Sequence, residues 1–451
     1  MSADSDCTSS GSLSQVVLYR SKEHCGIIVA NWHIAAHPGN RRYERLNKNM
    51  AEQALARMRV LEWCNMAAGP YCTKLLADLG AEVIKVEPPC GGDGSRRQGP
   101  FLADIPDSEK SGLFLFLNTS KLGITLDVAS PGGKRIFLEL LKQADILVMD
   151  AQQRQVKKLG LDYTTLRELN RGLILTSITP FGLTGPYKNY KSYPLNTFNA
   201  GGEAYMTPAG TPFLDRPPLK LANYASEIMC GISSAGAALC AYFSRLRTGE
   251  GQLIDMSKQE ALLFLNIDAI LRYPHYGAIT SRLTRGMPVG GIFRCKDGYI
   301  AFSPMRREHW AAFFEILQGP ESRKDERLTD LNYLEEHRLE LREIAQKFLM
   351  RRTKEEIYAS PLARECPLGP CYNIEEVVNS PQMQSRGFFV EIDHPVAGKL
   401  KYPSAPYKFS ETPWKVQHPA PMLGEHNEDV YCRRLGYSKH DLVMLREAGV
   451  I

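Results

Sequence analysis

The sequence predicts an α/β protein whose large domain is a doubly wound parallel sheet, accompanied by a smaller α+β domain. Two observations support this fold class: a strand–turn–helix–strand unit near residues 60–86, and several further strand–helix units in succession. A chain of 451 residues is long enough for two domains with sizeable cores. We expect an N-terminal extension over residues 1–54, the first part of the large domain over 55–255, a linker and small domain over 256–400, and a return to the large domain over 401–451.

The first unit begins with Val60–Trp63, which we interpret as a short buried strand. After a turn at Gly69–Pro70, leucines at helical spacing in Tyr71–Leu79 predict a helix, and Gly80 is a natural residue to end it. Glu82–Val86 is the next predicted strand. The unit lacks a GxGxxG motif, so it does not predict a dinucleotide site.

Later segments repeat this alternation and then change character. Further strands are predicted at residues 124–126, 146–148, 173–178 and 253–255, and helices at 131–143, 164–170, 227–247 and about 259–273. Residues 274–292 are rich in Gly, Arg and Pro and predict a linker. Gly298–Ser303 and the amphipathic Arg338–Arg351 indicate the small α+β domain.

Composition narrows the classes of function. The net charge is +5, with 55 basic and 50 acidic residues well mixed, so nucleic acid is not an expected partner. The sequence has no run of about 18 apolar residues, so we expect no membrane span. Eleven cysteines without a CxxC pair or zinc spacing indicate reduced thiols and no metal site. Met1–Gln15 has no apolar core of a signal peptide, so we expect a cytoplasmic protein.

Several motifs occur in a fixed order along the chain. They are Ala68–Pro70, Leu76–Glu87, Asn118–Lys121, Leu126–Asp127, Leu159–Tyr163, Phe181–Tyr187, Thr248–Gln252, Cys366–Pro370 and Ala420–His426. In this combination the chain, from near Leu55 onward, resembles the class III CoA-transferases, the family of formyl-CoA transferase, carnitine CoA-transferase and α-methylacyl-CoA racemase. The resemblance implies an interlocked homodimer, with acyl-CoA and a small carboxylic acid as substrates. It implies coenzyme A as a substrate and no tightly bound cofactor.

Glu227 is the candidate nucleophile. With Ser226 as candidate N-cap, an acid in the first helical turn complements the helix dipole, and that role alone is purely structural. The resemblance implies more, because the count back from Thr248 lands on Glu227 where the family normally has Asp. A rival alignment places Asn223 there, and an Asn side chain could not form an anhydride.

The resemblance also implies a coenzyme A site. Its expected residues are Asn65, Met66, Ala67, Ala68, Leu126, Asp150, Lys158, Leu159, Lys191 and Tyr193. A turn that feeds a helix can offer N–H groups to phosphate, and Lys158 replaces a family Arg as a point charge. Gly290 and Gly291 stand where a mobile glycine loop covers the active site of formyl-CoA transferase.

The departures from the family pattern all fall at the expected site. They are Pro88, Asp150–Ala151, Ser192–Pro194 and the Glu227 or Asn223 position. The leading interpretation is CoA transfer from an acyl-CoA to a carboxylic acid through acyl-glutamyl anhydride and glutamyl-CoA thioester intermediates. The alternatives are an acyl-CoA racemase, isomerase or lyase on the same fold, or a catalytically altered protein that binds CoA thioesters.

Overall fold

The structure is a computed structural model that describes residues 53–209, 213, 215–221, 224–282 and 288–451. In the N-terminal segment it describes two paired antiparallel strands, β1 (Val16–Arg20) and β2 (Cys25–Val29). The expected extension over residues 1–54 lies mostly outside the described residues. Asn223 lies outside them as well.

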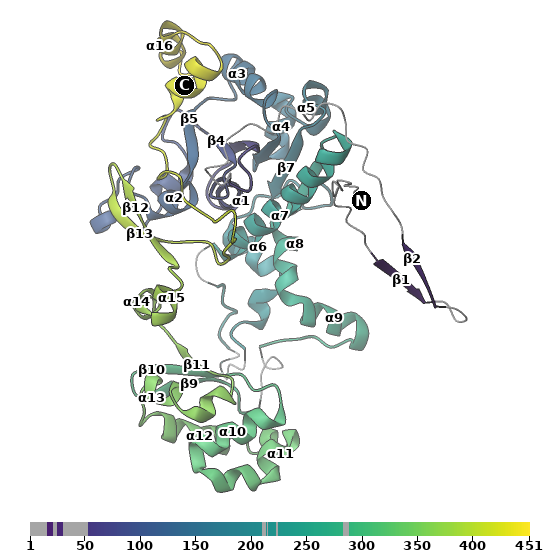
Figure 1. Cartoon of the computed structure of the whole chain (residues 1–451), viewed down its shortest axis with the longest axis vertical. Helices are drawn as coiled ribbons and strands as arrows, with labels where there is room; N and C mark the ends of the chain where they lie inside the picture. Colours follow the sequence, from purple (N-terminus) through teal and green to yellow (C-terminus); the bar gives the residue numbers. More distant parts are fainter. Residues whose placement is uncertain are drawn as a thin grey trace, which may run out of the picture. The chain divides into compact units, whose positions relative to one another are not determined.

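The large domain is built on a six-stranded sheet in which all neighbouring strands are parallel (Figure 1). Its strands are β3 (Arg59–Trp63), β4 (Glu82–Glu87), β5 (Lys121–Thr125), β6 (Ile146–Met149), β7 (Ile174–Thr179) and β8 (Leu253–Ser257). Their spatial order is β5–β4–β3–β6–β7–β8, so the chain reverses its direction of travel across the sheet between β3 and β6. The predicted α/β class with a parallel sheet is confirmed. Ligands of such sheets bind beyond the carboxyl ends of the strands at this switch point.

Helices cover both faces of the sheet. On one face lie α1 (Ala68–Ala77) and α7 (Ala225–Thr248), and on the other α3 (Pro131–Leu141), α4 (Gln153–Leu159) and α5 (Tyr163–Leu169). Strand neighbours alternate between the two cores: Val60 packs on the α1–α7 side and Leu61 on the α3–α5 side. The helix predicted over residues 131–143 is present as α3, which Ser130 caps and Pro131 opens as the first residue.

Two glycines let α1 lie close to its neighbours. A Cβ atom on Gly69 would lie 2.2 Å from the Cys64 Sγ, and one on Gly231 would lie 2.8 Å from the Ala68 carbonyl oxygen. Neither position has room for a larger side chain without a shift of its surroundings. The first turns of α7 are therefore held against the start of α1, with Gly231 beside Ala68.

By length and composition α7 is apolar enough to cross a membrane. Core helices of soluble proteins pass the same criterion, so one such helix is weak evidence. Buried residues along α7, from Cys230 to Ala241, belong to the core cluster that also contains Ile146 and Ile174 of the sheet. Packing on the sheet accounts for the apolar residues on the buried face of this helix, while Ile232, Phe243 and Leu246 are exposed.

The predicted helix over residues 259–273 is not continuous. The structure has α8 (Lys258–Leu263), a 3₁₀ turn η5 (Phe264–Asn266) and then α9 (Ile267–Tyr276). At the break, the Asn266 side chain donates a hydrogen bond of 3.0 Å to the Gly201 carbonyl. A contact with a residue distant in the sequence thus interrupts a segment that has helical spacing.

The small domain, green in Figure 1, has its own sheet and core. Strands β9 (Gly291–Cys295), β10 (Gly298–Phe302) and β11 (Leu368–Cys371) pair antiparallel in the order β11–β10–β9. Helices pack on this sheet, chiefly α10 (Arg307–Gln318) and α12 (Arg338–Leu349). Its core includes the Phe302 and Phe313 rings, stacked with centroids 4.0 Å apart.

Beyond the small domain the chain forms a hairpin, β12 (Phe389–His394) and β13 (Gly398–Pro403), and then reaches the edge of the large sheet. There the His426 N–H donates to the Gly123 carbonyl at 2.9 Å, and the Asn427 side chain accepts from the Thr125 N–H at 2.9 Å. The Tyr431 hydroxyl donates to the Thr125 carbonyl at 2.6 Å. These bonds occupy the free edge of β5 that would otherwise be open to pairing with another chain.

Candidate active site

The turn after β3 and the residue after β6 meet at the switch point of the sheet. The Asn65 N–H donates to both Asp150 carboxylate oxygens, at 3.1 and 3.0 Å. Two of the residues expected to bind coenzyme A are thus in direct contact. Because strands β3 and β6 are neighbours, their carboxyl ends bring these residues to one edge of the sheet.

The backbone of this turn is unusual at Met66, whose φ of 68° lies in the left-handed region. Such a residue costs on the order of 1 kcal/mol, so its surroundings must hold it in place. The Met66 N–H donates to the Asp93 carboxylate at 3.0 Å, and the Gly94 N–H donates to the Asn65 side chain at 2.7 Å. The loop after β4 therefore fixes the shape of the turn that precedes α1.

Glu227 lies in the first turn of α7 and is 3% exposed. Its Oε2 accepts a hydrogen bond of 2.6 Å from the Ser226 Oγ. The expectation that Ser226 caps the helix is wrong, because α7 begins at Ala225 and its N-cap is Tyr224, whose side chain makes no capping bond. Ser226 instead uses its hydroxyl to hold the Glu227 carboxylate.

Lys258 is a site residue that sequence reasoning missed. It is the first residue of α8, directly after β8, and its Nζ lies 3.9 Å from the Glu227 Oε1. Its position after a parallel strand was the available signal, since the carboxyl ends of such strands share one edge. The structure thus places an ammonium group beside the candidate nucleophile.

Burial raises the pKa of the Asp150 carboxyl to about 6. The Lys258 ammonium and the Asn65 N–H pull that pKa down, but they do not outweigh the burial. Lys258 therefore acts on Asp150 as well as lying beside Glu227. The three charged groups form one cluster at the carboxyl edge, which we call the edge cluster: Asp150, Glu227 and Lys258.

Cys230, one helical turn beyond Glu227, is a poor rival nucleophile. Burial raises the pKa of its thiol to about 11, despite the opposing effect of Lys258. The thiolate is the reactive form of cysteine, so this residue stays inert near neutral pH.

A second group of charges lies inside the sheet beside the edge cluster. Glu62 of β3 receives the Lys85 Nζ at 2.7 Å, the Lys121 Nζ at 2.8 Å and the Thr73 hydroxyl at 2.5 Å. The Lys85 Nζ also contacts the Asp93 carboxylate at 2.7 Å. All of these side chains are fully or almost fully buried. We call this group, Glu62, Thr73, Lys85, Asp93 and Lys121, the buried charge network.

The other residues expected at the coenzyme A site are more scattered. Ala67 and Ala68 are buried at the start of α1, and Leu126 is buried just after β5. Lys158 is exposed and Leu159 half-buried at the end of α4, while Lys191 and Tyr193 are exposed before α6 (Pro194–Ala200). No hydrogen bond or ion pair between described residues joins any of them to Glu227. Their role in binding stays a prediction.

Gly290 and Gly291 belong to the small domain. The Gly290 carbonyl accepts a hydrogen bond from the Arg342 guanidinium of α12, and Gly291 opens β9 with a φ of 107°. Their described contacts stay within this domain. The expectation of a loop over the active site therefore stays a prediction.

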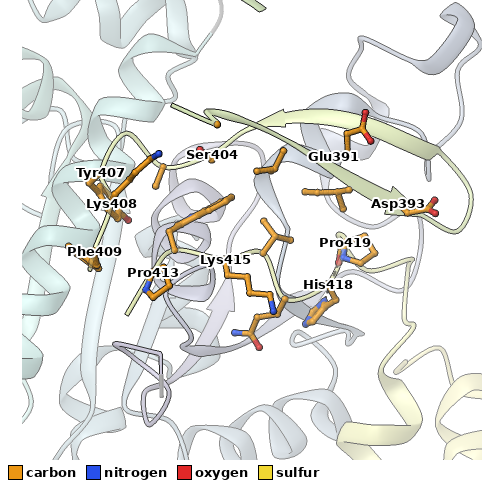
Figure 2. A pocket seen from close by; sticks show the side chains of 17 residues that line it. Glu391, Asp393, Ser404, Tyr407, Lys408, Phe409, Pro413, Lys415, His418 and Pro419 are labelled. Atoms are coloured by element: carbon orange, nitrogen blue, oxygen red, sulfur yellow. Dashed lines mark hydrogen bonds between the residues drawn. The ribbon is translucent and has the colours of Figure 1, made fainter. Parts of the chain in front are cut away.

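A cavity of about 580 Å³ is drawn in Figure 2, and no residue of the edge cluster lines it. The hairpin β12–β13 and residues 404–419 line it, with Tyr407, Lys408 and Phe409 toward one end and Glu391 and Asp393 toward the other. Its wall contacts the sheet at the amino end of β5, where the Gln417 N–H donates a hydrogen bond to the hydroxyl of Ser120, the residue before this strand. This cavity is thus no part of the carboxyl-edge site.

No three or more His, Cys, Asp or Glu side chains are grouped to hold a metal ion within the part of the chain that the structure describes. The described cysteines are all free thiols. The polar groups that the structure brings together at the carboxyl edge are carboxylates, an ammonium group and backbone N–H groups.

The parallel sheet and the charged side chains beyond the carboxyl ends of its strands are typical of an α/β enzyme. The sequence model of CoA-transferase family III matches residues 55–427, so the chain belongs to this family. It is 31% identical to the succinate–glutarate CoA-transferase of Agrobacterium fabrum over 381 residues, which is 83% of this chain and 94% of that protein. It is 30% identical to the formyl-CoA:oxalate CoA-transferase of Streptomyces coelicolor over 431 residues, 89% of this chain and 100% of that protein.

A solved structure of a family member has the same fold as this chain. The crystal structure of a CAIB/BAIF family protein from Brucella suis superposes with a TM-score of 0.74 at 28% identity, over 85% of this chain and 99% of that one. The chain is therefore a transferase enzyme, and CoA thioesters are the substrates that CoA-transferases use.

Proposed function

We propose that this enzyme moves coenzyme A from an acyl-CoA donor to a small carboxylic acid, with Glu227 rather than Asn223 as nucleophile. The observation that supports it is the Glu227 carboxylate itself: it is buried in the first turn of α7, oriented by Ser226 and faced by Lys258. Succinate, glutarate and oxalate appear in the names of the relatives, and all three are dicarboxylic acids. A small dicarboxylic acid is therefore the proposed substrate class.

In the first half of the reaction a Glu227 oxygen attacks the thioester carbonyl carbon. A C–O bond forms, the C–S bond breaks, and the electron pair leaves on the CoA thiolate. The thiolate then attacks the Glu227 carbonyl carbon of the resulting anhydride. The donor acid leaves as a carboxylate, and the enzyme is left as a glutamyl-CoA thioester.

The second half runs the same steps with the acceptor. Its carboxylate attacks the glutamyl thioester and expels the CoA thiolate, which gives a second anhydride. The thiolate attacks the acceptor's acyl carbon, and Glu227 leaves as a free carboxylate. No net proton is taken up or released, so the site needs no dedicated general base.

Each attack creates an oxyanion that must be stabilised. The N-cap residue of α7, Tyr224, makes no side-chain capping bond, so within the described residues no side chain caps the N–H groups of the first turn. N–H groups placed in advance around a developing oxyanion are among the largest sources of rate enhancement. The start of α7 thus supplies both the nucleophile and donors for the charge that forms on it.

Intact mass spectrometry tests the proposal. Wild type and Glu227→Gln are incubated with succinyl-, glutaryl-, oxalyl- and acetyl-CoA, with and without hydroxylamine. We expect a CoA-sized adduct, or a hydroxamate at Glu227, in wild type alone. Turnover of the variant should fall by at least about 1,000-fold, or about 4 kcal/mol. Glu168→Gln, the same change at an exposed position on α5, is the matched control.

The contrary outcomes are equally clear. Coenzyme A binding without any adduct would overturn the transferase mechanism and favour a racemase, isomerase, lyase or binding function. Absence of coenzyme A binding would overturn the proposed site as a whole.

We further propose a cytoplasmic enzyme that acts as an interlocked homodimer. Large apolar side chains are exposed on η5 and α9, with Phe264 74%, Ile267 58% and Tyr276 80% exposed. Apolar surface of this kind is typical of an interface between subunits. Light scattering after gel filtration would give twice the chain mass of 50.6 kDa for a dimer. The mass of one chain would refute the dimer.

A further inference from the structure

We infer that Lys258 binds the carboxylate of the incoming acceptor and so makes the enzyme selective for anionic acceptors. The inference rests on the proposed function and assigns a role within that reaction. It starts from the edge cluster, in which one ammonium group stands near two carboxylates.

The contact between Lys258 and Glu227 is close but incomplete. The Nζ lies 3.9 Å from the Glu227 Oε1, beyond hydrogen-bond distance, and the lysine side chain is 19% exposed. Among the described residues none lies within hydrogen-bond distance of this Nζ. The ammonium therefore has donors free for a ligand.

The location of Lys258 gives no structural reason for a cation. As the first residue of α8 it stands at the end of a helix where the dipole disfavours positive charge. Lys85 of the buried charge network differs, because carboxylates bond it at 2.7 Å on two sides. The Lys258 ammonium thus lies near Glu227 without a hydrogen bond to a carboxylate of the described residues.

The reaction itself changes the charge that Lys258 faces. In the resting enzyme its ammonium stands near the carboxylates of Glu227 and Asp150. Once Glu227 is an anhydride or a thioester it is neutral, and Lys258 has lost one negative neighbour. An acceptor carboxylate that enters at this stage restores the missing charge, next to the carbon that it must attack.

Lysine suits this alternation. Its ammonium is a point charge on a flexible stem, so it can follow whichever carboxylate occupies the site at each stage. A neutral nucleophile such as water or hydroxylamine would gain nothing from it. Selectivity for carboxylates over water then follows from one side chain.

The test separates anionic from neutral acceptors. Wild type, Lys258→Met, Lys258→Arg and the exposed control Lys142→Met are loaded with CoA from succinyl-CoA, and discharge of the glutamyl-CoA enzyme by glutarate and by hydroxylamine is followed by mass spectrometry. In Lys258→Met, kcat/KM for glutarate should fall about 10- to 100-fold, the loss expected for one hydrogen bond to a charged group. Discharge by hydroxylamine should change less than about threefold, and Lys258→Arg should retain most of the glutarate activity.

Other outcomes overturn the assignment. Equal losses with both acceptors would make Lys258 a positioning residue for Glu227, and no loss with either would leave it without a role. Loading that fails only in Lys258→Met would place its function in the first half of the reaction. Loading that fails in wild type would instead overturn the proposed function on which the inference rests.

Discussion

Two carboxylates near the switch point have pKa values displaced in opposite directions. Burial would raise the pKa of Glu62, but Lys121 and Lys85 outweigh it and hold that pKa at about 2. Burial raises the pKa of Asp150 to about 6, because its charged partners are too weakly placed to compensate. Glu62 lies on β3, and Asp150 directly follows the neighbouring parallel strand β6.

The difference separates charges that hold the fold from charges left for chemistry. In the buried charge network every ammonium and carboxylate has a partner within 2.8 Å. In the edge cluster the distance from Lys258 to Glu227 is 3.9 Å. Perturbed and incompletely paired groups of this second kind are typical of functional sites.

The largest expected effect comes from breaking the buried charge network. Lys85→Met would leave Glu62 and Asp93 each short of a buried partner, and the free energy of unfolding should fall by about 3–5 kcal/mol. Urea denaturation measures this loss. Lys258→Met is the matched comparison and should cost less than about 1 kcal/mol. Equal losses in the two variants would erase the distinction between the two groups.

The next effect is the pH dependence that the two carboxylates give with opposite signs. The pKa of Asp150 rises from 3.8 to about 6 on folding, so its protonated form is favoured and its contribution to stability is lost as pH rises from about 4 to 6. Asp150→Asn should therefore gain about 1–3 kcal/mol relative to wild type between pH 4 and pH 7. Urea denaturation at these pH values is the measurement, and a pH-independent difference would contradict it.

Glu62 supplies the contrast within the same experiment. Its folded pKa of about 2 lies below the ordinary value of 4.5, so its contribution is complete above pH 4.5 and is lost as pH falls toward 2. When the same urea denaturation is extended from pH 4 down to pH 2, the free energy of unfolding should therefore fall through Glu62, in a range where the Asp150 contribution no longer changes.

The smallest effect belongs to a pair of charges at the surface. Arg167 and Glu250 are joined at 3.0 Å, but both side chains are about half exposed, at 53% and 46%. Arg167→Ala should lower the free energy of unfolding by less than about 0.5 kcal/mol, because solvent already screens the pair. A loss above about 1 kcal/mol in urea denaturation would show that burial is the wrong criterion for ranking these pairs.

The sequence predicted the sheet better than the site. Apolar runs and turn residues indicated all six strands of the large sheet, because they are set by local burial. The bounds of β5 were displaced, since the strand spans Lys121–Thr125 rather than residues 124–126. The break at η5 was missed, since it depends on a bond from Asn266 to the distant Gly201. Lys258 was missed because its neighbours, Glu227 and Asp150, come from α7 and from the end of β6.

The charged residues inside the strands show a second limit of prediction from the sequence. Glu62, Lys85 and Lys121 lie on β3, β4 and β5, and each is fully buried. Their identities alone are those of exposed residues. The register of β3 and β4 places Glu62 beside Lys85, and the Lys121 side chain reaches Glu62 from β5. Only these contacts between strands make the burial of the charges tolerable.

The edge of β5 has a consequence for how the chain acquires its structure during synthesis. The hydrogen bonds to Gly123 and Thr125 come from His426, Asn427 and Tyr431, about 300 residues further along. During synthesis the whole small domain is made before His426, Asn427 and Tyr431. The edge of β5 therefore stays unpaired while the second domain is synthesised. During this interval the nascent chain is most exposed to strand pairing with other chains.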